Sequence, residues 1–295
     1  MFKIGVITRT KNRPLLLRRC ADGLARQNYK NFVWSIVNDV GDVESVDEVV
    51  RYARNDLGLN VECLHLKESF GIENAANQGI LNSDSELIHI HDDDDSIADG
   101  FYGAVVDKFE VLGPHFQGVV VDTRTIEEQV SSNDIKFIKS YISHKAIDGV
   151  HLADILQKNR FPPISLIYKK SAFEKIGPYD INLPVLGDWD FNIRLLMSGD
   201  LAYISMPLAN YHIRLSSDGM QAQTITSGDG RHDLYSAVVR NKYARNSGDA
   251  KLFLALAMTV GRQVQKVQSD VIEMSNMQKA AWTLKKLLKK VLVHR

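Results

Sequence analysis

The sequence predicts an α/β fold in which a mostly parallel central sheet is flanked by helices and followed by a helical C-terminal extension. Three observations support this prediction. Short apolar segments alternate with helical segments of 10 to 15 residues over the first 120 residues, a pattern typical of βαβ units. Polar clusters follow several of the apolar segments. From roughly residue 232 onward, the pattern is almost wholly helical.

Four short apolar runs predict the parallel strands. They cover residues 3–8, 32–38, 61–66 and 87–90. The helices between them are predicted from their periodicity, and they start near Pro14, Ser45 and Ile72. Because parallel strands run in the same direction, their carboxyl ends meet at one edge of the sheet, where such sheets bind their ligands.

The second half of the chain has a less regular pattern. Residues 123–160 are polar and irregular, and we interpret them as a variable connection or lid. A strand, a short helix and a turn follow, and an amphipathic helix is predicted to begin near Asp188. We divide the chain into a sheet domain of residues 1–230 and a helical extension of residues 231–295.

The charge of the chain is balanced, with 36 basic and 36 acidic residues. No chain-wide field favours a nucleic-acid partner, and we expect none. The two cysteines, Cys20 and Cys63, have neither metal-ligand spacing nor a disulfide framework, which indicates a reducing, cytoplasmic setting. The N-terminus has no signal-peptide pattern. The longest apolar run, residues 252–260, has about half the length that a bilayer-spanning helix needs.

Four consecutive aspartates, Asp92 to Asp95, follow the predicted strand at residues 87–90. Adjacent carboxylates repel one another, and a cation among them would relieve that repulsion. Carboxylate oxygens suit Mg²⁺ or Mn²⁺, and Mg²⁺ is often held by one or two carboxylates together with substrate phosphates. Asp92 and Asp94 lie on one side of an extended segment and could converge on such an ion. The alternative is a solvated acidic loop that caps the following helix.

Polar residues that could hold a nucleotide follow the first two predicted strands. They are Thr10, Asn12, Arg13 and Asp39. The Asp39 carboxylate could accept a hydrogen bond from a uracil or guanine N–H, or from a ribose hydroxyl. The chain has no G-x-G-x-x-G and no G-x-x-x-x-G-K-[ST] sequence. It therefore lacks the main signatures of dinucleotide-binding oxidoreductases and P-loop NTPases.

Three segments carry a more specific pattern. They read VITRTKNRPLLLRRCADGLARQNYKNFVWSIVNDVGD, GIENAANQGILNSDSELIHIHDDDD and IGPYDINLPVLGDWDFNIRLLMSGDLAYI. In this order and spacing, the chain resembles family 2 glycosyltransferases of the GT-A fold over roughly residues 3–215. The resemblance implies that Asp39 contacts the nucleotide. It also implies that Asp92 and Asp94 form the family's Asp-x-Asp metal-binding pair, and that Asp188 is the catalytic base.

The match to the family pattern has two departures. Thr10 and Arg13 fall on the family's nucleotide-side turn, but Lys11 stands where the family usually has Tyr. The family's acidic pair before a Trp is Gly187-Asp188 in this chain. Asp188 is thus the one carboxylate at the matching position, and Asp190 is its nearest alternative.

The resemblance implies an inverting, metal-dependent glycosyltransferase with Mn²⁺ or Mg²⁺ as its cofactor and Asp188 as its general base. The enzyme would move a sugar from a nucleoside diphosphate sugar, expected to be a UDP-sugar, to a hydroxyl of an acceptor. We expect that acceptor to be a glycan or a lipid-linked saccharide, as in bacterial cell-surface polysaccharide assembly. Two alternatives remain. One is a sugar-phosphate nucleotidyltransferase, whose Gly-rich loop is missing near residue 10, and the other is a non-catalytic nucleotide- or glycan-binding module.

Two further residues have both a functional and a structural interpretation. His212 is a candidate metal ligand or diphosphate contact, because the family often carries a histidine near this place, and otherwise it is a packed residue. Trp189 is a candidate for the wall of the acceptor pocket, and otherwise it is a core residue.

The C-terminal residues 279–295 carry six basic residues and no acidic one. In a helix their leucines fall on one stripe and their lysines stand off it, which predicts peripheral contact with an anionic membrane surface. We therefore expect a cytoplasmic protein that docks on the cytoplasmic face of the inner membrane. The alternative is a helix that packs on its own domain or on a second subunit of a homo-oligomer.

Overall fold

The computed structural model describes residues 1–131, 134–144, 149–215, 230–245, 254, 256–275 and 277. The chain divides into two compact units. The first comprises Met1–Ile155 with Asn159–Val239, and the second comprises Leu156–Lys158 with Arg240–Arg295. Each unit is described by itself below.

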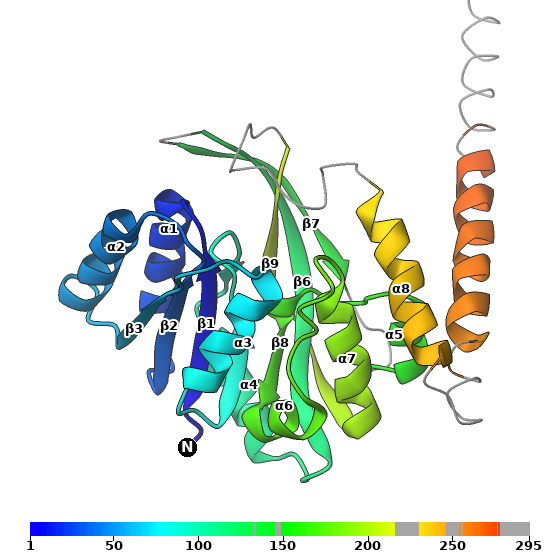
Figure 1. The fold of residues 1–295 in the computed structure, drawn as a ribbon, viewed down its shortest axis with the longest axis horizontal. Helices are drawn as coiled ribbons and strands as arrows, with labels where there is room; N and C mark the ends of the chain where they lie inside the picture. The colour runs from blue at the N-terminus through cyan, green and yellow to red at the C-terminus, as the bar shows by residue number, and fades with distance from the viewer. Residues whose placement is uncertain are drawn as a thin grey trace, which may run out of the picture. The chain divides into compact units, whose positions relative to one another are not determined.

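The first four strands of the first unit pair in parallel, as the sequence predicts (Figure 1). Across the sheet their order is β3-β2-β1-β4. The strands are β1 (Ile4–Thr10), β2 (Phe32–Asn38), β3 (Val61–His65) and β4 (Leu87–Ile90). The helices that connect them are α1 (Pro14–Ala25), α2 (Val43–Asn55) and α3 (Ile72–Asn82). The predicted βαβ units are therefore confirmed, with four carboxyl ends along one edge.

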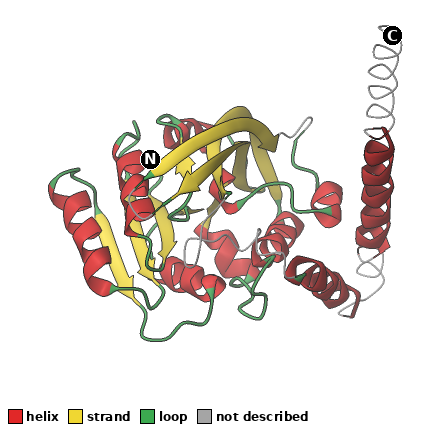
Figure 2. Cartoon of the chain, turned by 90° about the horizontal axis from the view of Figure 1, so that it is seen from above, coloured by secondary structure: helices red, strands yellow, loops and turns green. Residues whose placement is uncertain are grey.

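Helices cover both faces of these parallel strands (Figure 2). Leu17 of α1 and Val46 of α2 pack in one core cluster with Val6 of β1. On the opposite face α3 lies close against β1, because a Cβ added at Gly79 would come within 2.5 Å of the Ile7 side chain. Val6 and Ile7 thus point to opposite faces, as the alternation of a strand requires. For this reason β2 and β4 are buried on both sides, whereas the edge strand β3 is only partly buried.

The second half of the sheet is partly antiparallel (Figure 1). Its strands are β5 (Ser96–Ile97), β6 (Phe116–Val130), β7 (Ile135–His144), β8 (Leu166–Lys169) and β9 (Asp200–Arg214). β8 pairs antiparallel with β4 and β6, β5 pairs antiparallel with β9, and β9 pairs parallel with β6. The helical elements of this half are α4 (Phe101–Glu110), α5 (Leu152–Gln157), the 3₁₀ helix η1 (Pro163–Ser165), α6 (Lys170–Ile176) and α7 (Gly187–Ser198). The described residues thus form a nine-stranded sheet flanked by helices, which confirms the predicted fold class.

Residues 123–130 of β6 and residues 135–144 of β7 differ from the predicted irregular connection. They belong to a β-hairpin in which β7 pairs antiparallel with β6. Most side chains of β7 are exposed, Phe137 and Tyr141 among them, so no alternation of buried and exposed residues marks this segment as a strand. The prediction was wrong here because β7 is fixed by its backbone pairing with β6 rather than by burial.

The C-terminal extension is helical where the structure describes it, as predicted. α8 (Arg231–Arg245) has residues in both units, and residues 254, 256–275 and 277 are helical. No helix among the described residues is long and apolar enough to cross a bilayer. The division between residues 230 and 231 stays a prediction. The predicted basic helix of residues 279–295 lies outside the described residues.

Candidate active site

A cavity of about 630 Å³ lies at the carboxyl ends of β1, β2 and β4. The predicted site residues that line it are Thr10, Arg13, Asp39, Asp92, Asp94 and Asp188. Thr10 is the last residue of β1, and the next four of these residues follow parallel strands, whose carboxyl ends meet at one edge of the sheet. Asp188 comes from the first turn of α7. Segments that are far apart in the chain therefore meet at one cavity.

Arg9 of β1 forms a two-pronged ion pair with Asp92. Its Nε lies 2.7 Å from Asp92 Oδ1, and its Nη2 lies 2.5 Å from Asp92 Oδ2. Burial acts to lower the pKa of Arg9, but the carboxylates of Asp92 and Glu73 raise that pKa above its ordinary value. Arg9 is thus a fixed positive charge in the cavity wall, at a position that no sequence motif marks.

Asp93 and Asp94 share a second arginine. Asp93 is fully buried and accepts a hydrogen bond from Thr10 Oγ1 at 2.7 Å, and Arg13 lies 3.1 Å from its other oxygen. Asp94 forms ion pairs with Arg13 at 3.2 Å and with Arg214 at 2.8 Å. Burial raises the pKa of Asp93 to about 7. Burial acts in the same direction on Asp94, but the two arginines hold the pKa of Asp94 below its ordinary value.

His212 contacts Asp95, Glu128 and Ser96. Its backbone N–H donates to Asp95 Oδ1 at 3.0 Å. Its Nδ1 lies 2.8 Å from Glu128 Oε2, and its Nε2 lies 2.8 Å from Ser96 Oγ. Glu128 also contacts Arg19, whose Nη1 lies 2.9 Å from both of its carboxylate oxygens. Both ring nitrogens of His212 thus have protein partners, and the described lining of the cavity does not include it. Its role as a metal ligand stays a prediction.

Asp92 and Asp94 are suited to a divalent cation by their chemistry and position. Their side chains are 23% and 18% exposed, whereas that of Asp93 is fully buried. Both line the cavity, and carboxylate oxygens are the donors that Mg²⁺ and Mn²⁺ prefer. The residues present therefore fit the cofactor that the resemblance implies. A bound ion would share these oxygens with the arginines that now contact them.

Asp188 is oriented by two hydrogen-bond donors. Asn159 Nδ2 donates to its Oδ2 at 2.6 Å, and the Trp189 backbone N–H donates to its Oδ1 at 2.8 Å. Asn192 Nδ2 donates in turn to Asn159 Oδ1 at 3.1 Å, which fixes the orientation of that amide. Burial raises the pKa of Asp188, and the two hydrogen bonds oppose the rise. An oriented carboxylate with a raised pKa has the properties of a general base.

The Trp189 side chain lies in the core and is 2% exposed. Its indole Nε1 donates to the Ile155 carbonyl at 2.6 Å. The described residues that line the cavity include Phe161, Pro163 and Tyr211 but not Trp189. The structure thus places the Trp189 side chain in the core, and its role in the acceptor wall stays a prediction.

Asp39 presents one buried oxygen without a partner. Its backbone N–H donates to the Thr10 carbonyl at 2.9 Å, and its Oδ2 accepts from Ser69 Oγ at 2.7 Å. Its Oδ1 is buried and has no hydrogen-bond donor among the described residues. Asn12, predicted beside it, accepts at Oδ1 from the Asp42 backbone N–H at 2.6 Å and braces the loop after β2. The described lining of the cavity does not include Asn12.

Glu73 of α3 is a second cavity residue that the motifs do not mark. It is 5% exposed, and its Oε2 lies 3.7 Å from Arg9 Nη1. Burial raises the pKa of Glu73 to about 8. The helical period places Glu73 on the same stripe as the buried Ala76 and Ile80. That periodicity is the sequence feature that could have identified a buried carboxylate here.

Residues 5–177 match the family model described as Glycosyl transferase family 2. The chain belongs to glycosyl transferase family 2. This match covers more than half of the 295 residues. It confirms the predicted family and enzyme class, so the protein is a glycosyltransferase.

Several named proteins and solved structures resemble this chain. A PGL/p-HBAD biosynthesis glycosyltransferase of Mycobacterium tuberculosis is 26% identical over 210 residues, which are 70% of this chain and 76% of that protein. S. aureus TarS 1-349 in complex with UDP-GlcNAc has a TM-score of 0.59 at 17% identity, over 87% of this chain and 71% of that chain. The mannosyltransferase PcManGT from Pyrobaculum calidifontis, in complex with GDP-Man and Mn²⁺, has a TM-score of 0.59 at 14% identity, over 95% of this chain and 80% of that chain. The family 2 chain described here spans 43% of the longer S. aureus TarS chain. These structures show the GT-A fold, as predicted.

Proposed function

We propose that this protein is an inverting glycosyltransferase that moves a sugar from a nucleoside diphosphate sugar to an acceptor hydroxyl, with Asp188 as the general base. One observation carries the proposal. Asp188 of α7 faces the same cavity as Asp39, Asp92 and Asp94, which follow the strands. A single displacement at the sugar requires the general base and the bound donor to lie in one cavity.

The nucleotide side of the proposal rests on Asp39 and the arginines. The buried Asp39 Oδ1 lacks a donor among the described residues, and an unpaired buried acceptor favours a ligand that brings an N–H or O–H group. A uracil N–H or a ribose hydroxyl would supply it. Arg9 and Arg13 line the same cavity and offer positive charge to a diphosphate. TarS 1-349 binds UDP-GlcNAc and PcManGT binds GDP-Man, which supports a nucleotide sugar, and we expect UDP.

The leaving-group side rests on Asp92 and Asp94. These two would hold Mg²⁺ or Mn²⁺, and PcManGT in complex with Mn²⁺ supports the use of a divalent ion. When bound, the cation would stabilise the negative charge that develops on the departing diphosphate. Arg13 and Arg214, which pair with Asp94 at present, would remain within reach of the diphosphate and add to that stabilisation.

The proposed reaction is one in-line displacement. The acceptor oxygen forms a bond to the anomeric carbon while the bond from that carbon to the diphosphate oxygen breaks. The acceptor proton passes to Asp188, whose carboxylate Asn159 and the Trp189 N–H hold in position. Because the attack and the departure occur on opposite faces of the sugar, the anomeric centre is inverted.

The acceptor is proposed to be a glycan or a lipid-linked saccharide. Phe161, Pro162 and Tyr211 give the cavity an apolar and aromatic wall, and sugar rings present apolar C–H faces to such surfaces. The alternative of a sugar-phosphate nucleotidyltransferase has no support from the family match.

The test compares the wild type with Asp188→Asn on UDP-sugars and GDP-sugars. We expect the variant to bind UDP with unchanged affinity and to lose about 10²–10⁴-fold in turnover, measured as released nucleoside diphosphate. Nuclear magnetic resonance of the product should show the opposite anomeric configuration to the donor. Near-normal turnover of the variant, or a product that keeps the configuration of the donor, would refute the proposal.

A further inference from the structure

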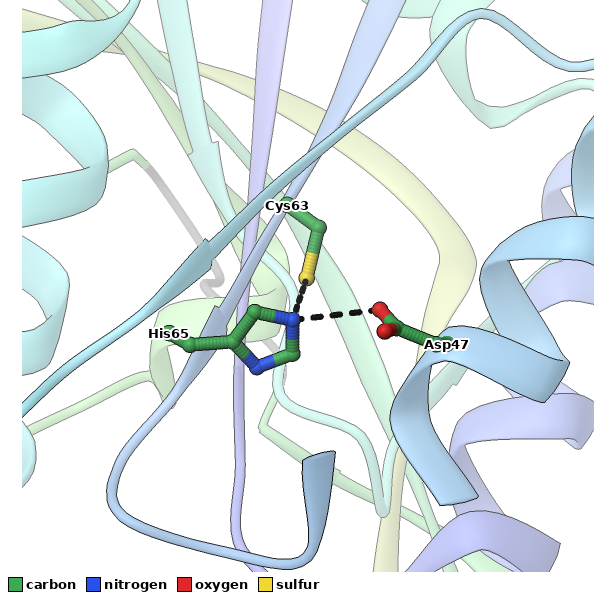
Figure 3. A group of neighbouring side chains, drawn as sticks. All are labelled: Asp47, Cys63 and His65. Atoms are coloured by element: carbon green, nitrogen blue, oxygen red, sulfur yellow. Dashed lines mark hydrogen bonds and ion pairs between the residues drawn. The ribbon is translucent and has the colours of Figure 1, made fainter. Parts of the chain in front are cut away.

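Three potential metal ligands lie together on β3 and α2 (Figure 3). The described lining of the active-site cavity includes none of them. Cys63 and His65 are two positions apart on β3, so their side chains share one face of the strand. Cys63 Sγ lies 3.5 Å from His65 Nε2, and that nitrogen lies 3.1 Å from Asp47 Oδ1. The three ligand atoms lie within 4.8 Å of one another. Sequence spacing alone does not show the cluster, because α2 and β3 bring Asp47 to the other two.

We propose that Asp47, Cys63 and His65 bind one divalent cation of the zinc class. A tetrahedral zinc with Zn–S near 2.3 Å and Zn–N near 2.0 Å sets its sulfur and nitrogen ligands about 3.5 Å apart. Its nitrogen and oxygen ligands lie about 3.3 Å apart by the same geometry. The observed separations of 3.5 Å and 3.1 Å are close to both values. Two of the three ligand pairs are therefore already spaced for the ion, and the third pair, Cys63 Sγ and an Asp47 oxygen, lies within 4.8 Å.

The donor set selects the kind of metal. A thiolate and an imidazole favour zinc and related transition metals over Mg²⁺, whereas the all-carboxylate pair Asp92 and Asp94 has the opposite preference. One thiolate and one carboxylate would neutralise the two positive charges of the ion. His65 and Asp47 have side chains that are 29% and 40% exposed, which leaves an entry path and room for a water molecule as the fourth ligand.

Metal binding requires two protons to leave their present atoms, the Cys63 thiol sulfur and His65 Nε2. Burial raises the pKa of the Cys63 thiol to about 11, so the thiol proton leaves when sulfur binds the metal. Asn38 Nδ2 lies 3.1 Å from His65 Nδ1. The same Nδ2 donates to the Gly41 carbonyl at 3.0 Å, and Asn38 Oδ1 accepts from the Gly41 N–H at 2.9 Å. These contacts make Nδ2 the donor, so His65 Nδ1 accepts and Nε2 carries the hydrogen.

The Asn38 side chain therefore opposes metal binding through His65, and a substitution at Asn38 can test this effect. Coordination through His65 Nε2 moves the ring proton to Nδ1, where it needs an acceptor. The Asn38 amide would have to turn its oxygen toward His65, at the expense of its two hydrogen bonds to Gly41. The Asn38→Asp substitution places a carboxylate oxygen at this position without that turn. It keeps the acceptor for the Gly41 N–H and loses only the bond to the Gly41 carbonyl. A carboxylate that accepts from the second nitrogen of a ligating histidine strengthens metal binding.

The experiment titrates the metal-free full-length protein with Zn²⁺ by calorimetry and with Co²⁺ by absorption spectroscopy. We expect one equivalent of Co²⁺ to produce a near-ultraviolet thiolate-to-cobalt band. Cys63→Ser should abolish the band, and Asp47→Asn and His65→Gln should each weaken Zn²⁺ binding by at least about tenfold. Asn38→Asp should tighten it by about tenfold. Cys20→Ala is the matched control, because it removes the other cysteine of the chain and should leave the band unchanged.

The outcomes separate the proposal from other sources of metal binding. Persistence of the thiolate band in Cys63→Ser, or its loss in Cys20→Ala, would overturn the site. Equal Zn²⁺ affinity in the wild type and Asp47→Asn would do the same, and Asp47 is exposed enough for that variant to fold. Unchanged affinity in Asn38→Asp would contradict coordination through His65 Nε2. Circular dichroism of each metal-free variant checks that the fold is intact.

Discussion

The Glu73 carboxylate of α3 fills the space that a side chain at residue 187 of α7 would occupy. A Cβ added at Gly187 would collide with Glu73 Oε1. The family pattern has an acidic pair before a Trp, but this chain has Gly187 followed by Asp188. Glu73 therefore brings a carboxylate from another element to the place where the first acidic residue of that pair is missing.

The burial of Glu73 should make the stability of the protein depend on pH. Its pKa is raised to about 8, so between roughly pH 4.5 and 8 the folded state holds a proton that the unfolded state releases. The free energy of unfolding should therefore fall as pH rises through this window and level off above it. Glu73→Gln should remove much of the fall, because glutamine mimics the protonated side chain.

Thermal melts of the wild type and Glu73→Gln at pH 5, 7 and 8.5 check this expectation. The melting temperature of the wild type should drop more steeply with pH than that of the variant. Glu174→Gln, at an exposed position of α6, is the control and should follow the wild type. Parallel pH profiles for the wild type and Glu73→Gln would show that Glu73 is ionised throughout.

Asn159 should tune the pH dependence of turnover through Asp188. Its amide donates to Asp188 at 2.6 Å and acts against the rise in the pKa of Asp188 that burial causes. Asn159→Ala should therefore raise that pKa further, so that the base ionises at higher pH. We expect the acidic limb of the kcat/KM profile to move upward by roughly one pH unit, with partial recovery of the rate above it. A uniform loss at every pH would indicate a purely structural role of Asn159.

Asp39→Asn should weaken nucleotide binding more than it affects the fold. The substitution keeps the size of the side chain but removes the charge from Oδ1, the oxygen proposed to accept from the base or ribose. Hydrogen bonds to charged groups are worth about 1.5–3 kcal/mol, so UDP affinity should fall about 10- to 100-fold, as measured by calorimetry. Asp56→Asn, at an exposed position after α2, is the control. Equal UDP affinity in the wild type and Asp39→Asn would remove Asp39 from the nucleotide site.

Removal of divalent metal should abolish turnover. Turnover should depend on the site of Asp92 and Asp94 but not on the site that contains Cys63. After chelation and dialysis, Mg²⁺ or Mn²⁺ should restore the release of nucleoside diphosphate in the wild type and in Cys63→Ser. Asp94→Asn should need a higher Mg²⁺ concentration for half-maximal turnover, because it removes one anionic oxygen ligand. Full turnover in the chelated protein would be incompatible with the proposed role of Asp92 and Asp94.

The sequence alone predicts the elements whose patterns are local. The strands β1, β2 and β4 are mostly apolar because both of their faces are buried, and the helices between the strands carry a helical period. The edge strand β7 was missed because exposure of most of its side chains leaves no pattern to read. Its structure depends on backbone pairing with β6, and that pairing is not encoded in a local window.

The sequence by itself determined the parallel sheet and the alignment of Asp39, Asp92 and Asp94 along one edge, because strand direction follows from the order of strands and helices. The sequence did not determine which basic and acidic side chains form ion pairs. The pairing of Arg9 with Asp92 joins β1 to the end of β4. The fit of Glu73 against Gly187 joins α3 to α7. The cluster of Asp47 with Cys63 and His65 joins α2 to β3. Each contact is between residues on different segments of the chain, so tertiary packing alone set the distances between them.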